Sequence, residues 1–62
     1  MSEKSAAIQA AVNAVAAATR AANTYGRNSQ KARIAYEAAM AEVRDARMCG
    51  ATDAEIRAAR PA

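Results

Sequence analysis

Alanine is the feature of this sequence that most restricts its fold. It supplies 21 of the 62 residues and is spread along the whole chain. Alanine has the highest helix propensity of the amino acids, and its small side chain lets two helices approach closely. Only two glycines and one proline interrupt the sequence. We therefore expect an all-α protein that folds as a single helical domain over residues 1–62.

Local signals divide the chain into three expected helices, at about residues 3–24, 29–48 and 52–60. Either Ser2 or Ser5 can cap the first helix, and either Asn28 or Ser29 can cap the second. These side chains accept hydrogen bonds from the free N–H groups at the start of a helix. A turn of about four residues would join the two long helices as an antiparallel hairpin.

Glycine and proline mark the ends of the expected helices. Gly26 and Gly50 follow the first and second helices, where a residue in the left-handed region commonly ends a helix. Thr52 and Glu55 have the spacing of a capping box, which would open the short third helix. Pro61 would stop that helix because proline lacks a backbone donor.

The larger apolar residues of both long helices recur in alternating steps of three and four. This heptad spacing is typical of helices that pack nearly parallel to one another. The chain has only ten side chains larger than alanine for a core, and no cysteine pair or metal-ligand cluster to stabilise so small a domain. We therefore expect a homodimer that completes a helical bundle, with an oligomer interface at Ile8, Val12, Val15, Tyr36, Met40 and Val43.

The segment 42–61 resembles the helix-turn-helix of bacterial and phage DNA-binding repressors at four positions: Ala46, Gly50, Thr52 and Ile56. A small residue lets the two helices cross closely, glycine accepts a positive φ, and a branched residue fills the angle between the helices. The resemblance implies recognition-helix positions at Thr52, Asp53, Ala54, Arg57 and Ala58. Together with Arg57, Arg60 is expected to contact phosphates.

A second basic region surrounds the predicted turn between the long helices. No acidic residue occurs between Lys4 and Glu37. The expected hairpin would gather the cations of this stretch at its tip, beside an exposed Tyr25. Clustered cations and an aromatic ring suit a phosphate backbone or a stacked base. The candidate nucleic-acid-binding residues at this tip are Arg20, Arg27, Lys31 and Arg33.

The sequence argues against an enzyme. Histidine is absent, no glycine-rich phosphate loop is present, and the six acidic residues fall on helix faces expected to be exposed. We expect no cofactor and no metal. The single cysteine, Cys49, is typical of a small buried residue in a reducing compartment. We expect neither a signal peptide nor a membrane-spanning run in this sequence, and therefore a cytoplasmic protein without a membrane partner.

The net charge of +3 favours a nucleic-acid partner over an acidic substrate. Our first functional hypothesis is a dimeric DNA-binding transcriptional regulator that uses its C-terminal helix-turn-helix-like segment. Two alternatives remain open: a protein-interaction module, such as a subunit, inhibitor or scaffold piece, and a small RNA-binding four-helix-bundle dimer. The same C-terminal segment also suits an ordinary helix–turn–helix that only closes a packed bundle.

Overall fold

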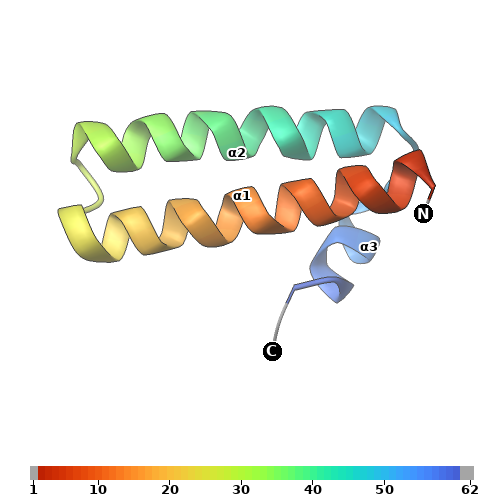
Figure 1. The fold of residues 1–62 in the computed structure, drawn as a ribbon, viewed down its shortest axis with the longest axis horizontal. Helices are drawn as coiled ribbons and strands as arrows, with labels where there is room; N and C mark the ends of the chain where they lie inside the picture. The colour runs from red at the N-terminus through yellow and green to blue at the C-terminus, as the bar shows by residue number, and fades with distance from the viewer. Residues whose placement is uncertain (1, 61–62) are drawn as a thin grey trace.

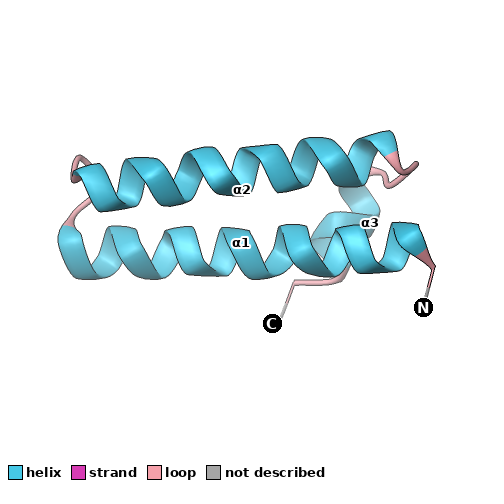
Figure 2. Ribbon diagram, turned by 45° about the horizontal axis from the view of Figure 1, so that its top comes forward, coloured by secondary structure: helices cyan, strands magenta, loops and turns pink. Residues whose placement is uncertain are grey.

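The computed structural model describes residues 2–60 and contains three α-helices within them (Figure 1). These helices are α1 (Glu3–Tyr25), α2 (Gln30–Met48) and α3 (Asp53–Ala58). Two of them, α1 and α2, lie side by side as an antiparallel hairpin, and α3 packs near the end where α1 begins (Figures 1 and 2). The predicted all-α hairpin is confirmed, whereas α3 is shorter than the expected range.

Serine side chains begin both long helices, as predicted. The Ser2 hydroxyl accepts a hydrogen bond from the Ser5 N–H at 3.1 Å, and the Ser29 hydroxyl accepts one from the Ala32 N–H at 3.1 Å. Gly26 ends α1 with φ +95°, in the region that L side chains rarely adopt. Each of these contacts joins residues close in sequence, which explains why the sequence alone predicted them.

A second local network starts α3. Gly50 has φ +97° and turns the chain after α2. Thr52 Oγ1 then accepts from the Glu55 N–H, and Glu55 Oε1 accepts from the Thr52 N–H, both at 3.1 Å. This is the predicted capping box. The helix already ends at Ala58, and the predicted stop at Pro61 lies outside the described residues.

Alanines fill the interface between α1 and α2. Their side chains are at most 3% exposed at Ala11 and Ala18 of α1 and at Ala32, Ala39 and Ala46 of α2. Within each helix these residues repeat every seven positions, so they form one row along each helix. The expectation that larger residues line the contact between the two helices is corrected. A row of methyl groups lets the backbones come closer than Tyr36 or Met40 would allow.

The short helix α3 covers part of one side of the hairpin. Ile56 is 6% exposed and joins a buried cluster with Val12, while Ile8 and Val43 pack against that cluster. Three of the six residues predicted for an oligomer interface, Ile8, Val12 and Val43, therefore make contacts within one chain. Of the other three, Val15 is half-buried, whereas Tyr36 and Met40 are exposed.

Cys49 is exposed, which corrects the expectation of a buried cysteine. It is the C-cap residue of α2, one position beyond the helix. Ala46, one helical turn earlier, takes the buried position instead. The burial expected for a small apolar residue is thus overridden by its place at a helix end.

The alanine interface predicts a cost for a larger side chain. Replacing Ala39 with leucine should lower the free energy of unfolding by about 1–3 kcal/mol, because the added atoms force the helices apart. Urea unfolding followed by circular dichroism measures this change. Ala41→Leu is the matched control, since Ala41 lies exposed on the same helix. Equal stability of the two variants would contradict close packing at Ala39.

Candidate nucleic-acid interface

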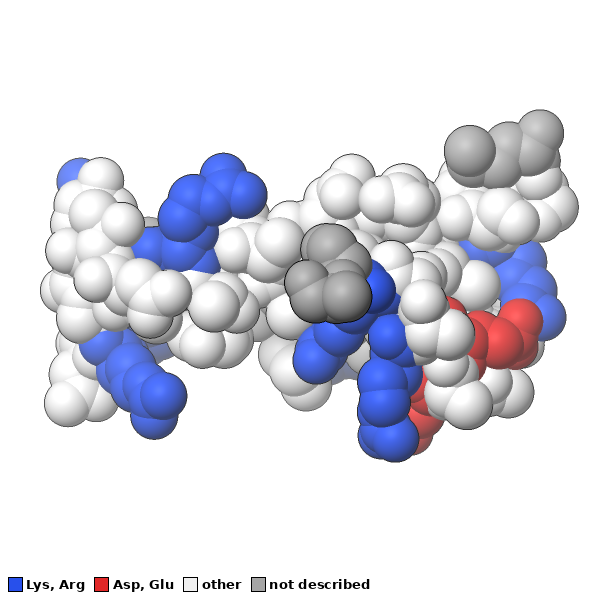
Figure 3. All heavy atoms as spheres, turned by 90° about the horizontal axis from the view of Figure 1, so that it is seen from below, with Lys and Arg blue, Asp and Glu red and all other residues white. Residues whose placement is uncertain are grey.

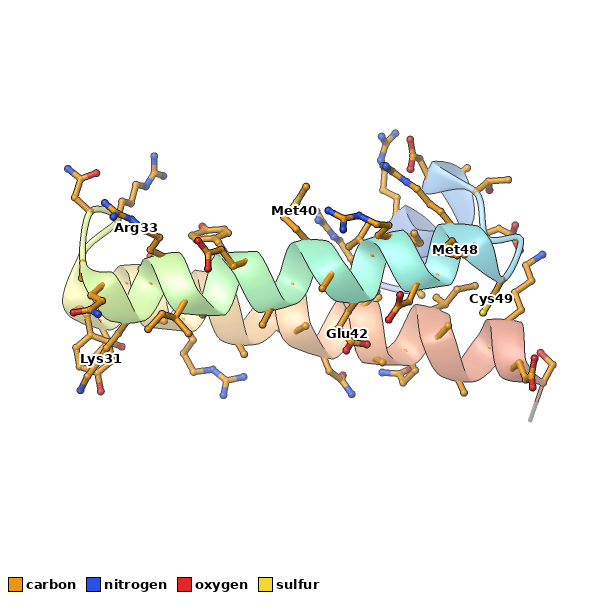
Figure 4. The ribbon with its side chains drawn as sticks, turned by 90° about the horizontal axis from the view of Figure 1, so that it is seen from above. Lys31, Arg33, Met40, Glu42, Met48 and Cys49 are labelled. Atoms are coloured by element: carbon orange, nitrogen blue, oxygen red, sulfur yellow. The ribbon has the colours of Figure 1, made fainter. Side chains whose placement is uncertain are left out.

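The side chains of α2 separate into two faces of the hairpin (Figure 4). Arg33 and Met40 point to the side on which α3 lies, whereas Lys31 and Glu42 point to the other side. Two positions along a helix correspond to a rotation of about 200°, which explains why Lys31 and Arg33 diverge. We call these sides the α3 face and the opposite face.

A basic hollow lies on the α3 face, between α2 and α3. Its volume is about 280 Å³, and its lining includes Arg47, Arg57, Arg60 and the single acid Asp53. Arg47 donates from Nε at 3.0 Å and from Nη2 at 2.7 Å to Asp53 Oδ1. Among residues 2–60, neither Arg57 nor Arg60 forms an ion pair. The hollow therefore carries two guanidinium groups that no described carboxylate neutralises.

Arg60 connects this hollow to the middle of α1. It also lines a second hollow of about 270 Å³ with Val15, Ala16 and Thr19 of α1. Val15 and Ala16 give this hollow apolar surface, and the Thr19 hydroxyl donates to the Val15 carbonyl at 3.0 Å. Arg60 therefore lines both hollows.

An exposed apolar ridge on α2 runs along the α3 face. Tyr36 is 43% exposed and Met40 is 61% exposed, and the two residues are four positions apart. Arg33 precedes Tyr36 by three positions, and Arg44 follows Met40 by four. Residues at these spacings are neighbours on a helix surface. The ridge is therefore flanked by a cation at each end.

Both acidic side chains of α3 are held by cations of the hairpin. Besides the Arg47–Asp53 pair, Lys4 Nζ lies 2.7 Å from Glu55 Oε2. The hydrogen bond from Lys4, followed by the one from the Thr52 N–H, lowers the pKa of Glu55 below its usual value. Each carboxylate of α3 therefore lies against a cation that neutralises it locally. In Figure 3, basic side chains lie over α3 and toward the turn, while acidic ones appear only near α3.

The residues predicted from the helix-turn-helix resemblance have distinct environments. The Thr52 hydroxyl accepts a hydrogen bond in the capping box, and the Asp53 carboxylate accepts one from Arg47. Ala54, Arg57 and Ala58 are exposed. The buried positions of the resemblance, Ala46 and Ile56, are 0% and 6% exposed. Thr52 and Ala59 are exposed as well.

The cations predicted to cluster at the turn do not form one surface. Arg27 lies in the turn, and Lys31 Nζ lies 4.3 Å from the centre of the Tyr25 ring. Arg20 lines a hollow with residues of the outer side of α1, including Ala17, Ala21 and Tyr25. Arg33 instead lies on the α3 face (Figure 4). The hairpin therefore separates Arg33 from Lys31, whereas Arg20 and Lys31 both lie beside Tyr25.

Sequence reasoning missed Arg44 and Arg47 as parts of a basic surface. They extend the row that begins at Arg33, at steps of eleven and three residues. Helical periodicity could have aligned them with Arg33. Periodicity could not show that Arg57 and Arg60 lie beside Arg47, because that depends on where α3 docks. The spacing of the arginines on α2 was therefore visible in the sequence, but the contribution of α3 to the same surface was not.

Comparisons with known proteins place the chain in no family. No family model matches it, and no curated protein or solved structure matches it. Over residues 2–60, no helix has the length and apolar character needed to cross a membrane. The same part of the chain contains no group of three or more His, Cys, Asp or Glu side chains arranged to hold a metal ion.

The Lys4–Glu55 contact predicts that docking of α3 depends on pH. The pKa of Glu55 is lowered in the folded state, so its stabilising contribution is present above the usual value of 4.5 and is lost as the pH falls through the lowered value. The methyl resonances of Ile56 should report this loss in an acid titration by NMR. Glu55→Gln should reduce the change, and Glu42→Gln should not. An unchanged titration in Glu55→Gln would contradict the role of this carboxylate.

Proposed function

We propose that this chain is a small nucleic-acid-binding regulatory protein that contacts phosphates through its α3 face. The observation that carries the proposal is the neutralisation of Asp53 and Glu55 by Arg47 and Lys4. Without those pairs, the two carboxylates of α3 would repel a phosphate backbone. With the pairs in place, the unpaired arginines beside them dominate the local field.

Arginine chemistry supports a phosphate partner. A guanidinium group presents a planar set of donors that can bind phosphate oxygens in a bidentate manner. Arg57 and Arg60 lie beside an open hollow of about 280 Å³. The +3 charge of the whole chain would add long-range attraction for a polyanion. Binding of this kind releases counterions, so its affinity must fall as salt rises.

The helix-turn-helix resemblance favours DNA among nucleic acids. Its buried positions agree with the packing of Ala46 and Ile56, and Ala54 and Ala58 leave little bulk on the exposed side of α3. Six helical residues span only about 9 Å, enough to bring one or two side chains to a groove or backbone. We therefore propose duplex DNA as the first target and single-stranded RNA as the alternative.

The apolar ridge supports a second candidate function, a protein-interaction module. Tyr36 and Met40 are more exposed than residues of a helical core, and neither is covered by α3. An amphipathic helix of a partner protein could bury them. This candidate needs no phosphate contact, so binding to nucleic acid and its dependence on salt separate the two functions.

Salt dependence tests the phosphate contacts directly. The affinity for labelled duplex DNA, measured by fluorescence anisotropy at several salt concentrations, should fall with a linear log–log slope. The double variant Arg57→Ala/Arg60→Ala should weaken binding to all sequences and flatten the slope by about 0.9 for each lost contact. The same titration with single-stranded RNA distinguishes the two nucleic-acid targets.

Arg20→Ala is the matched control for this experiment, because Arg20 lies on the outer side of α1 rather than beside α3. It should lower the affinity much less than the double variant on α3, and leave the slope nearly unchanged. Loss of binding in Arg20→Ala but not in the α3 variant would place the contact at the turn. A folded protein that binds neither nucleic acid would contradict the proposed function and favour the interaction module.

A further inference from the structure

The opposite face of α2 carries a cation and an anion at equal distances from its centre. Lys31 lies four residues before Ala35, and Glu42 lies four residues after Ala38. Steps of four, three and four place all four residues on one side of the helix. Figure 4 shows Lys31 and Glu42 on the same side, away from α3. The midpoint between Ala35 and Ala38 therefore has a cation at one end and an anion at an equal distance on the other.

We propose that a second copy of this chain binds this face, with its α2 antiparallel to the first and a two-fold axis between Ala35 and Ala38. A two-fold axis places the same surface of both copies in contact, so residue pairs occur twice. Lys31 of each copy then faces Glu42 of the other copy. Ala35 of each copy faces Ala38 of the other, and these small side chains permit close approach of the helices.

The environment of Glu42 favours this occupant. Glu42 is half-buried, yet it forms no ion pair among residues 2–60. The neighbouring helix offers it no cation, because residues 5–19 of α1 contain no charged residue. Lys31 is held at the same side by its contact with the Tyr25 ring, 4.3 Å away. A second copy supplies the missing partner to both charges at once.

The α3 face is a poorer choice for self-association. There the ridge of Tyr36 and Met40 lies between Arg33 and Arg44. An antiparallel copy centred on that ridge would bring arginines of the two chains together, and like charges across an interface oppose binding. The opposite face avoids this repulsion. Dimerisation through the opposite face also leaves both α3 faces exposed. The proposed dimer therefore does not depend on the proposed nucleic-acid function.

Dimerisation would also add stability that the small core of one chain does not supply. Val12 and Ile56 are the only side chains larger than alanine in the buried core of residues 2–60. A domain of about 60 residues is marginal when its own core is the sole source of stability. Contact along the opposite face adds buried alanine methyl groups and the stems of Lys31 and Glu42.

Charge reversal tests this interface. Sedimentation equilibrium of the full chain should give a dimer for the wild type. Glu42→Lys and Lys31→Glu should each weaken dimerisation by at least about tenfold, because each substitution places like charges together at two symmetric positions. The double variant Lys31→Glu/Glu42→Lys should restore dimerisation, since it exchanges the two charges and recreates both pairs.

Glu37→Lys is the matched control, with the same charge change on another side of α2, and it should dimerise like the wild type. Circular dichroism confirms that each variant keeps its helix content. A wild type that stays monomeric at about 1 mM would overturn the proposal. A dimer that tolerates Glu42→Lys, or a double variant that fails to recover, would equally overturn it.

Discussion

The close contact between the alanine rows of α1 and α2 determines where every larger side chain can lie. Ala11 and Ala18 face the row of Ala32, Ala39 and Ala46, and the space between the helices is filled by methyl groups. Larger residues such as Met40 cannot enter that space without separating the helices. They are displaced to the sides of the hairpin, where they either meet Ile56 of α3 or remain exposed.

This displacement links the fold to the candidate interface. The apolar side of the hairpin is long enough to extend beyond α3, so α3 covers only the part nearest the start of α1 (Figure 1). Docking by Ile56 brings the arginines of α3 beside Arg47 and places two acids against cations of the hairpin. The basic character of the α3 face is therefore a product of packing as well as of net charge.

The helix ends and the capping box were predictable because each depends on residues three or four positions apart. Ser29 and Thr52 find their N–H partners within one turn, whatever the rest of the chain does. The inner face of α2 was not predictable in the same way. Two heptad series, one of alanines and one containing Tyr36 and Met40, both have the right spacing, and the larger residues suggested the wrong one. The candidate site was predicted only in part, because Arg57 and Arg60 were identified but Arg47, which lines the same hollow, was not.

Three helices, their N-caps and the turns at Gly26 and Gly50 can be predicted from the sequence, because they follow from local hydrogen bonding and from backbone conformations that glycine accepts. The tertiary structure alone decided which row of α2 faces α1, that Cys49 is exposed, and which cations share a surface with α3. Those outcomes depend on how closely two helices can approach and on where a six-residue helix finds a buried site for Ile56. They are long-range packing effects, which residue spacing along the chain does not specify.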